Sequence, residues 1–228
     1  MINLQNNTFD ISSGARAVRH NVLRNTYWLL ALSMVPTVLG AVIGVMAHIP
    51  AFRGGLGALL FLGIAFGFIW GIERNKESGL GVALLLGFTF FMGLMLTPLL
   101  TFTLGFSNGA FLIMTAFGGT AAVFASLATV ATVSKRDFSA MGKWLFAGLI
   151  VLMLASFANI FLGIPALYIA TSVIAIAIFS AYILYDVQQI VNGGETNYIS
   201  ATLRIYLDVY NIFVNLLSLL GIFGGNRD

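Results

Sequence analysis

The chain has no cysteine among its 228 residues. This absence excludes a disulfide framework, thiolate metal sites and a cysteine nucleophile. Charge is also scarce, because only 8% of the residues are Asp, Glu, Lys or Arg, whereas a soluble domain carries about a quarter. So few charges could not cover a water-exposed surface, so we expect most of the surface to face lipid.

Signatures of enzymes and of nucleic-acid binding are missing as well. His20 and His48 lie far apart, and neither has a carboxylate or a second histidine at ligand spacing. The chain has no HExxH, P-loop or GxSxG pattern. The formal net charge of +3 comes without a basic patch that has interleaved aromatic residues. We therefore predict that the protein is not an enzyme, has no resident cofactor and does not bind nucleic acid.

What the sequence does contain is long apolar runs. A hydrocarbon core of ~30 Å is crossed by about 20 apolar residues in a helix. Runs of this kind predict one all-α membrane domain, a bundle of seven transmembrane helices at residues 27–47 (interrupted by Pro36), 54–72, 79–102, 108–133, 144–162, 166–191 and 200–223. Residues 1–26 are polar and lack a cleavage site, so we expect an uncleaved cytoplasmic N-terminal tail, with the transmembrane domain at 27–223 and a short C-terminal tail at 224–228.

The positive residues are distributed unevenly between the two ends of the predicted helices. One end carries most of them: Arg16, Arg19, Arg24, Arg74, Lys76, Lys135, Arg136, Lys143 and Arg204. The other end has only Arg53 and Arg227. The positive-inside rule then places the N-terminus in the cytoplasm and the C-terminus outside.

Glycines recur at four-residue spacing in the first two predicted spans. Gly40 and Gly44 form one such step, and Gly63, Gly67 and Gly71 form two more. Small residues at this spacing allow helix backbones to approach closely. We therefore expect both sets to pack against neighbouring helices.

Two acidic residues, Asp186 and Asp208, lie inside predicted spans. Ionisable side chains inside a membrane are costly and usually face the interior of a bundle. From the helix rise, Asp186 lies ~8 Å and Asp208 ~12 Å from the cytoplasmic ends of the last two spans. Since these spans are antiparallel neighbours, we expect the two carboxyl groups to lie at similar depth and to meet.

Other polar residues extend this pair into stripes at helical spacing. In the last span the stripe consists of Arg204, Asp208, Asn211 and Asn215, and in the sixth span of Tyr182, Asp186 and Gln189. Such a stripe cannot face lipid, so the last helix is predicted to lie in the middle of the other six.

The aspartate pair has two interpretations. Two carboxylates in a poorly hydrated site cannot easily both ionise, so they are expected to share a proton, to join the two helices when protonated, and to bind or pass a cation when not. Calcium is the favoured ion, because it prefers oxygen ligands. The alternative is a purely structural hydrogen bond. Arg204 lies on the same face and either forms an ion pair with Asp208 or, as we favour, extends to the membrane surface.

Several segments resemble one known family. Residues 182–190 (YILYDVQQI) closely resemble the sixth-helix motif of the Bax inhibitor-1 (TMBIM) family, and residues 206–208 (YLD) and 211–217 (NIFVNLL) resemble its seventh-helix motif. Residues 22–27 (VLRNTY) and 193–199 (GGETNYI) are similar to the bacterial YccA-like branch. The resemblance covers nearly the whole chain, and the last 45 residues carry its specific part.

The resemblance implies a seven-helix fold with a central last helix, in a bacterial inner membrane. It also implies two candidate roles. Members that leak calcium use a pair of aspartates as a pH-sensitive latch, and Asp186 and Asp208 match those positions. YccA-like members instead bind and restrain the membrane AAA protease FtsH. The chain departs from the leak pattern in two ways, since residues 54–72 contain no acidic residue and Arg204 is atypical.

Overall fold

Seven helical spans form the bundle in a computed structural model that describes residues 4–48, 54–134 and 136–226, with only the backbone for residues 4–17, 54 and 55. The helices are α1 (Leu4–Met46), α2 (Gly54–Arg74), α3 (Gly79–Met95), α4 (Thr97–Leu104), α5 (Gly109–Val133), α6 (Gly142–Leu162), α7 (Pro165–Asn192) and α8 (Tyr198–Gly224). A 3-10 turn, η1 (Ser139–Met141), precedes α6, and the described residues contain no strand. Because α3 and α4 together form one span, seven segments are long and apolar enough to cross a membrane, which confirms the predicted fold class.

The first span differs from the prediction in two respects. Its helix begins at Leu4, so most of the predicted N-terminal tail is helical and continuous with the span. The expected interruption at Pro36 is also wrong, because α1 continues through this residue. Proline is tolerated in membrane helices where side chains satisfy nearby backbone groups. Next to the Leu32 carbonyl that Pro36 leaves without its helical donor, the Thr37 hydroxyl donates to the Ser33 carbonyl at 2.8 Å.

The third span is broken near the end opposite the N-terminus. Helix α3 ends at Met95, and α4 begins at Thr97 with Pro98 in its first turn. Proline lacks the backbone N–H that an unbroken helix would use there, but it suits the first turn of a new helix. The predicted single helix at 79–102 is therefore two helices with one short joint.

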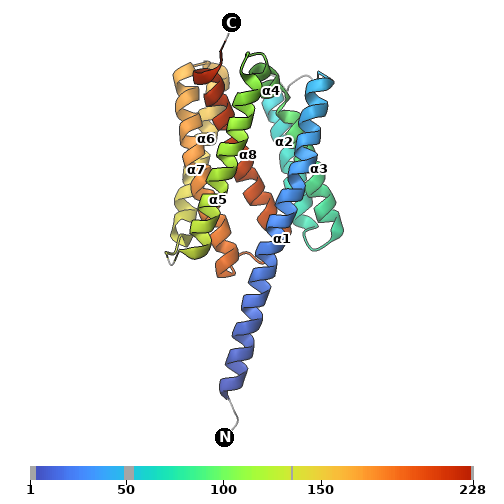
Figure 1. Ribbon diagram of the computed structural model, residues 1–228, viewed down its shortest axis with the longest axis vertical. Coiled ribbons are helices and arrows are strands. Elements are labelled where there is room, and N and C mark those ends of the chain that lie inside the picture. Colours follow the sequence, from blue (N-terminus) through green and yellow to red (C-terminus); the bar gives the residue numbers. More distant parts are fainter. Residues whose placement is uncertain (1–3, 49–53, 135, 227–228) are drawn as a thin grey trace.

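Helix α8 lies in the middle of the bundle, as predicted. Within the described residues it contacts every other helix except α6 (Figure 1). Helix α6 packs against α7 and α2 and is the most exposed span. The central position explains how α8 can carry polar residues at several levels without presenting them to lipid.

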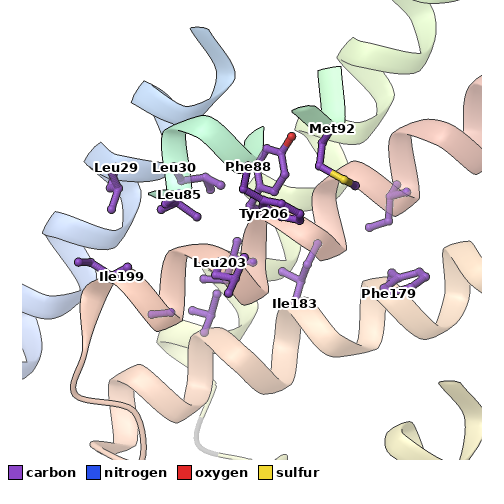
Figure 2. Packing of buried hydrophobic residues seen from close by; sticks show 14 of the residues in the cluster. Leu29, Leu30, Leu85, Phe88, Met92, Phe179, Ile183, Ile199, Leu203 and Tyr206 are labelled. Atoms are coloured by element: carbon purple, nitrogen blue, oxygen red, sulfur yellow. The ribbon is translucent and has the colours of Figure 1, made fainter. Parts of the chain in front are cut away.

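The core forms where α8 meets α1, α3 and α7. Figure 2 shows the Tyr206 ring of α8 beside Phe88 of α3, with Leu203 and Ile183 below them. Tyr206 is the largest fully buried side chain, at 1% exposure. Its hydroxyl lies 2.9 Å from the Thr37 hydroxyl of α1 and 3.4 Å from the Thr89 carbonyl oxygen of α3. One side chain thus links three helices at the centre of the core.

The glycine prediction holds for the first helix and only in part for the second, where a Cβ on Gly71 would lie 3.5 Å from the Leu84 side chain of α3. A Cβ on Gly40 would lie 2.2 Å from the Phe90 carbonyl oxygen, and one on Gly93 would lie 2.1 Å from the Thr37 carbonyl oxygen, so α1 and α3 pack backbone to backbone. A Cβ on Gly63 or Gly67 of α2, in contrast, would have no neighbour within 4 Å among the described residues. These two glycines face outward because α2 lies at the edge of the bundle, where spacing alone does not decide which face packs.

The connections α2–α3, α5–α6 and α7–α8 lie at one end of the bundle, and the chain's N-terminus extends beyond that same end (Figure 1). The C-terminus lies at the opposite end. The predicted grouping of basic residues therefore has a structural counterpart, although Arg53, Lys135 and Arg227 lie outside the described residues. The cytoplasmic location of the N-terminal end stays a prediction.

Candidate aspartate pair between the last two helices

Asp186 of α7 and Asp208 of α8 lie side by side inside the bundle. Their side chains hydrogen-bond to each other, and they are only 7% and 4% exposed. The contact arises because α7 and α8 are antiparallel and joined by a turn of residues 193–197, which brings similar depths of the two helices together. Sequence spacing predicted this meeting.

The hydrogen bond between the two carboxyl groups depends on their protonation. Two ionised carboxylates have only acceptors, so a hydrogen bond between them requires one proton. The Asp208 Oδ2 atom is buried and accepts no hydrogen bond from an N–H or hydroxyl group among the described residues. A buried oxygen without a donor costs free energy, so this oxygen depends on a proton, a water molecule or a cation at the pair.

Among the described residues Arg204 forms no ion pair with Asp208, although its charge lies within electrostatic range of both aspartates. Its Nη2 atom lies 3.2 Å from Oε2 of Glu195, in the turn between α7 and α8, and its side chain is 49% exposed. The arginine therefore reaches the end of the bundle and forms an ion pair there. Glu195 was not among the predicted site residues, although it lies within electrostatic range of Asp186.

The remaining members of the predicted stripes are placed differently. Tyr182 is half-buried within electrostatic range of both aspartates. Asn211 and Asn215 donate their amides back to carbonyl groups of α8 itself, Leu207 and Asn211, each at 2.8 Å. Both amide groups therefore hydrogen-bond within α8 instead of forming one network with Asp208.

In α7 the buried glutamine is Gln188, not the predicted Gln189. The Gln188 side chain accepts a hydrogen bond from the Phe138 backbone and donates one to the Arg136 carbonyl, so it holds the α5–α6 connection. Gln189 is half-buried beside Gly194. Helical spacing from Asp186 pointed to Gln189, but α7 packs against α5, α6 and α8 and buries more than one face.

The turn between α7 and α8 is hydrogen-bonded to neighbouring parts of the chain. Gly193 takes a left-handed conformation with φ of 79°, which ends α7. Asn197 caps α8 by accepting from Ile199 and Ser200, and its amide donates to the Lys76 carbonyl in the α2–α3 connection at 3.0 Å. The turn is thereby tied to the α2–α3 connection at this end of the bundle.

A second contact joins α2 to the same region. Glu73 lies in the last turn of α2, accepts a hydrogen bond from Ser200 at 3.0 Å and pairs with Lys76 at 3.2 Å. The predicted second span ended at residue 72 and so contained no acidic residue. The helix extends two residues further and includes one, at the membrane edge rather than deep inside.

The pair does not form a complete metal site. Calcium takes six to eight oxygen ligands, and no group of three or more His, Asp or Glu suited to a metal occurs in the described part of the chain. Two carboxyl groups suit a proton or a cation in passage better than a resident ion.

Comparison with known proteins places these features in a family. The family model for the inhibitor of apoptosis-promoting Bax1 matches residues 19–225. A membrane protein of Vibrio cholerae is 40% identical over 216 residues, which is 94% of this chain and 96% of the relative. The Escherichia coli K12 protein named modulator of FtsH protease YccA is 38% identical over 202 residues, covering 89% of this chain and 90% of the relative. A Neisseria meningitidis protein is 35% identical over 221 residues, 95% and 97% of the two chains.

The matched region includes all seven spans and both aspartates, and the relatives align over nearly their whole lengths. The chain is therefore a multi-pass membrane protein that belongs to the Bax inhibitor-1 family.

Proposed function

We propose that the protein is a pH-sensitive cation leak, with calcium as the favoured ion and the aspartate pair as its gate. The observation that carries this proposal is the contact between the Asp186 and Asp208 carboxyl groups inside the bundle. The buried Asp208 Oδ2 supports it, because no N–H or hydroxyl group among the described residues occupies that oxygen, so a cation can meet it once the shared proton leaves.

The gate works through charge. With one proton shared, the pair joins α7 to α8 and closes the path that a cation would take between them. When pH rises and that proton is lost, two negative charges at hydrogen-bonding distance repel each other. Separation of the helices then relieves the repulsion and exposes two carboxylates to a cation. Cation flux should therefore rise with pH.

Flux in reconstituted liposomes that contain a calcium dye tests this proposal between pH 5 and pH 8. We expect several-fold faster calcium entry at the higher pH, and loss of this pH dependence in Asp186→Asn and Asp208→Asn. The control is Asp137→Asn, which should behave as the unmodified protein. The Ser139 hydroxyl and backbone N–H hold the pKa of the exposed Asp137 carboxyl below its usual value, so it stays ionised throughout. Flux no faster than in empty liposomes across the range would refute the leak.

A second function, restraint of an FtsH-type membrane protease, has a separate observation in its favour. Helix α1 is 43 residues long, about 65 Å at 1.5 Å per residue, whereas the hydrocarbon core is ~30 Å thick. The N-terminal part of this helix projects from the bundle (Figure 1). The name of the Escherichia coli relative supports a protease partner, and a projecting helix offers a surface for one. As part of this second function, we propose that the protein is located in a bacterial inner membrane.

Co-purification tests the second function. The tagged full chain should retain FtsH in mild detergent, and a variant without residues 1–20 should lose it. A matched control replaces residues 1–20 with an unrelated helical sequence of equal length, which separates loss of the binding surface from loss of the extension. Failure of the full chain to retain FtsH would argue against this function.

A further inference from the structure

The ion pair of Glu195 and Arg204 lies on the side of the aspartates that faces the turn between α7 and α8. Arg204 precedes Asp208 by four residues on α8, which places it about 6 Å nearer the start of that helix. Glu195 precedes α8 altogether, in the turn. Since this turn lies at the end of the bundle from which the N-terminus extends (Figure 1), the ion pair lies between the depth of Asp208 and that end.

Glu195 is held in place by the turn. Its side chain is only 12% exposed. Its Oε1 atom accepts a hydrogen bond from the Asn197 backbone N–H at 2.9 Å, and its own backbone N–H donates to the Gln189 carbonyl at 3.0 Å. The other carboxylate oxygen, Oε2, contacts Arg204 at 3.2 Å. The turn therefore positions the carboxylate, and the carboxylate positions the guanidinium.

Both charges of this ion pair act on the aspartates. Arg204 lies within electrostatic range of Asp186 and Asp208, and Glu195 lies within range of Asp186. A positive charge near ionised carboxylates repels a cation that approaches them, whereas a nearby negative charge attracts it. The two members of one ion pair therefore have opposite effects on a cation at the aspartates.

These effects depend on the charge of the cation. The Coulomb energy between two charges is proportional to each of them. At the same position, the repulsion by Arg204 and the attraction by Glu195 are therefore twice as strong for calcium as for potassium. Protonation of the aspartates, in contrast, opens or closes the path for both ions alike.

The largest opening elsewhere in the bundle does not suit a hydrated cation. A cavity of about 540 Å³ lies between α2, α3, α6, α7 and α8. Its lining is apolar except for Tyr210 and Asn211, which already donate to the Met92 and Leu207 carbonyls. A cavity with such a lining stays dry. We therefore expect cations to reach the aspartates from the end that carries the turn.

From this arrangement we infer that Glu195 and Arg204 set the preference for divalent over monovalent cations at the aspartate pair, with Arg204 disfavouring divalent ions and Glu195 favouring them. The inference rests on the proposed function, because it concerns the cation that meets the two aspartates. Neither Glu195 nor Arg204 is a ligand of that ion, since both act on it through charge at a distance.

Flux through reconstituted liposomes at pH 8, measured for calcium and for potassium, tests the inference. Arg204→Gln should raise the ratio of calcium to potassium flux about fivefold, and Glu195→Gln should lower it about fivefold, each corresponding to about 1 kcal/mol. The ratio cancels changes in gating and in the amount of reconstituted protein. Glu195→Gln keeps an acceptor for the Asn197 N–H, so the turn should fold normally.

The two substitutions separate charge from structure. Each breaks the same ion pair, so a purely structural role predicts changes in the same direction. Arg204→Lys keeps the positive charge and should keep the ratio of the unmodified protein. The matched control is Lys76→Gln, which breaks the ion pair with Glu73 in the α2–α3 connection and should leave the ratio unchanged. Changes in the same direction, or an unchanged ratio in both Gln variants, would overturn the inference and leave the leak intact.

Calcium-dependent stability tests the inference without any flux. An ion that binds only the folded protein raises its unfolding temperature. At pH 8 and constant ionic strength, replacing potassium with calcium should raise the unfolding temperature more in Arg204→Gln, and less in Glu195→Gln, than in the unmodified protein. Absence of flux for both ions would refute the leak, and this order of shifts would still support the inference. Equal shifts or the reverse order would overturn it.

Discussion

At the scale of single residues, Tyr206 determines how the central helix is held. Its ring packs edge-on against Phe88 at 6.2 Å between ring centres, and its hydroxyl meets groups from α1 and α3. A buried hydroxyl must find partners, and here the partners belong to two other helices. Tyr206 therefore sets the rotation of α8, which in turn directs Asp208 toward α7.

Removing the Tyr206 hydroxyl should lower stability modestly. Tyr206→Phe keeps the ring and loses the hydrogen bond to Thr37, which still donates to the Ser33 carbonyl. We expect a loss of about 1 kcal/mol in the free energy of unfolding, measured by titration from mild detergent into a denaturing one. Tyr168→Phe, at a 43% exposed position, is the control and should change stability little. An equal effect of both substitutions would contradict this account of Tyr206.

The partner of Arg204 can be identified with double-mutant cycles. The Glu195–Arg204 pair has an arginine that is half exposed, so its coupling energy should be at most ~1 kcal/mol. The cycle combines Glu195→Gln with Arg204→Gln and is measured by the free energy of unfolding. A parallel cycle of Arg204→Gln with Asp208→Asn should give a smaller coupling. The reverse order would mean that Arg204 pairs with Asp208 and holds it ionised, against the shared proton.

At the scale of helices, the contact between α1 and α3 depends on glycines that the structure leaves no room to replace. Gly44 brings α1 equally close to α4, because a Cβ there would overlap the Thr97 side chain at the start of that helix. Helix α2 has an equally regular glycine series, but Gly63 and Gly67 have open space beside them. The same spacing therefore has different meanings in a central and in a peripheral helix.

Matched alanine substitutions should reveal this difference. Gly40→Ala forces a Cβ against the Phe90 carbonyl, and overpacking of this kind costs about 1–3 kcal/mol. Gly67→Ala has open space and should leave stability unchanged or raise it by up to about 1 kcal/mol, because alanine favours helix more than glycine. Thermal unfolding in detergent measures both. Equal destabilisation would show that α2 packs on another chain through this face.

At the scale of the whole molecule, the basic residues distinguish one end of the bundle from the other. The connections that carry Arg74, Lys76 and Arg136 lie at the end from which α1 projects (Figure 1). At the opposite end, the α4–α5 connection holds the end of α8, where the Asn108 side chain donates to the Gly224 carbonyl at 2.7 Å.

The orientation in the membrane can be measured with single cysteines, because the natural chain has none. Ser139 and Ser107 are exposed and lie in connections at opposite ends. We expect a membrane-impermeant thiol reagent to label Ser107→Cys in intact spheroplasts, and Ser139→Cys only after permeabilisation, because positively charged loops stay in the cytoplasm. The opposite labelling pattern would reverse the predicted orientation.

Much of the architecture could be read from apolar length. Each span needs about 20 apolar residues, and this requirement located all seven, with errors only at ends and breaks. The joint at residue 96 and the extended α1 were missed, because helical structure outside the membrane and local breaks leave no signal in hydropathy. The contact between Asp186 and Asp208 could be predicted because the two residues lie at similar depths from the same end of two adjacent antiparallel helices.

Composition, hydropathy and helical period by themselves determined that this is a seven-span membrane bundle with a central last helix and a buried acidic pair. They did so because burial of polar groups in lipid is costly enough to dictate which faces turn inward. Only the tertiary structure decided that Arg204 pairs with Glu195, that Gln188 rather than Gln189 is buried, that α2 turns Gly63 and Gly67 outward and that an apolar cavity opens beside it. These outcomes depend on helix rotation and on contacts between segments distant in the chain, which a one-dimensional period does not specify.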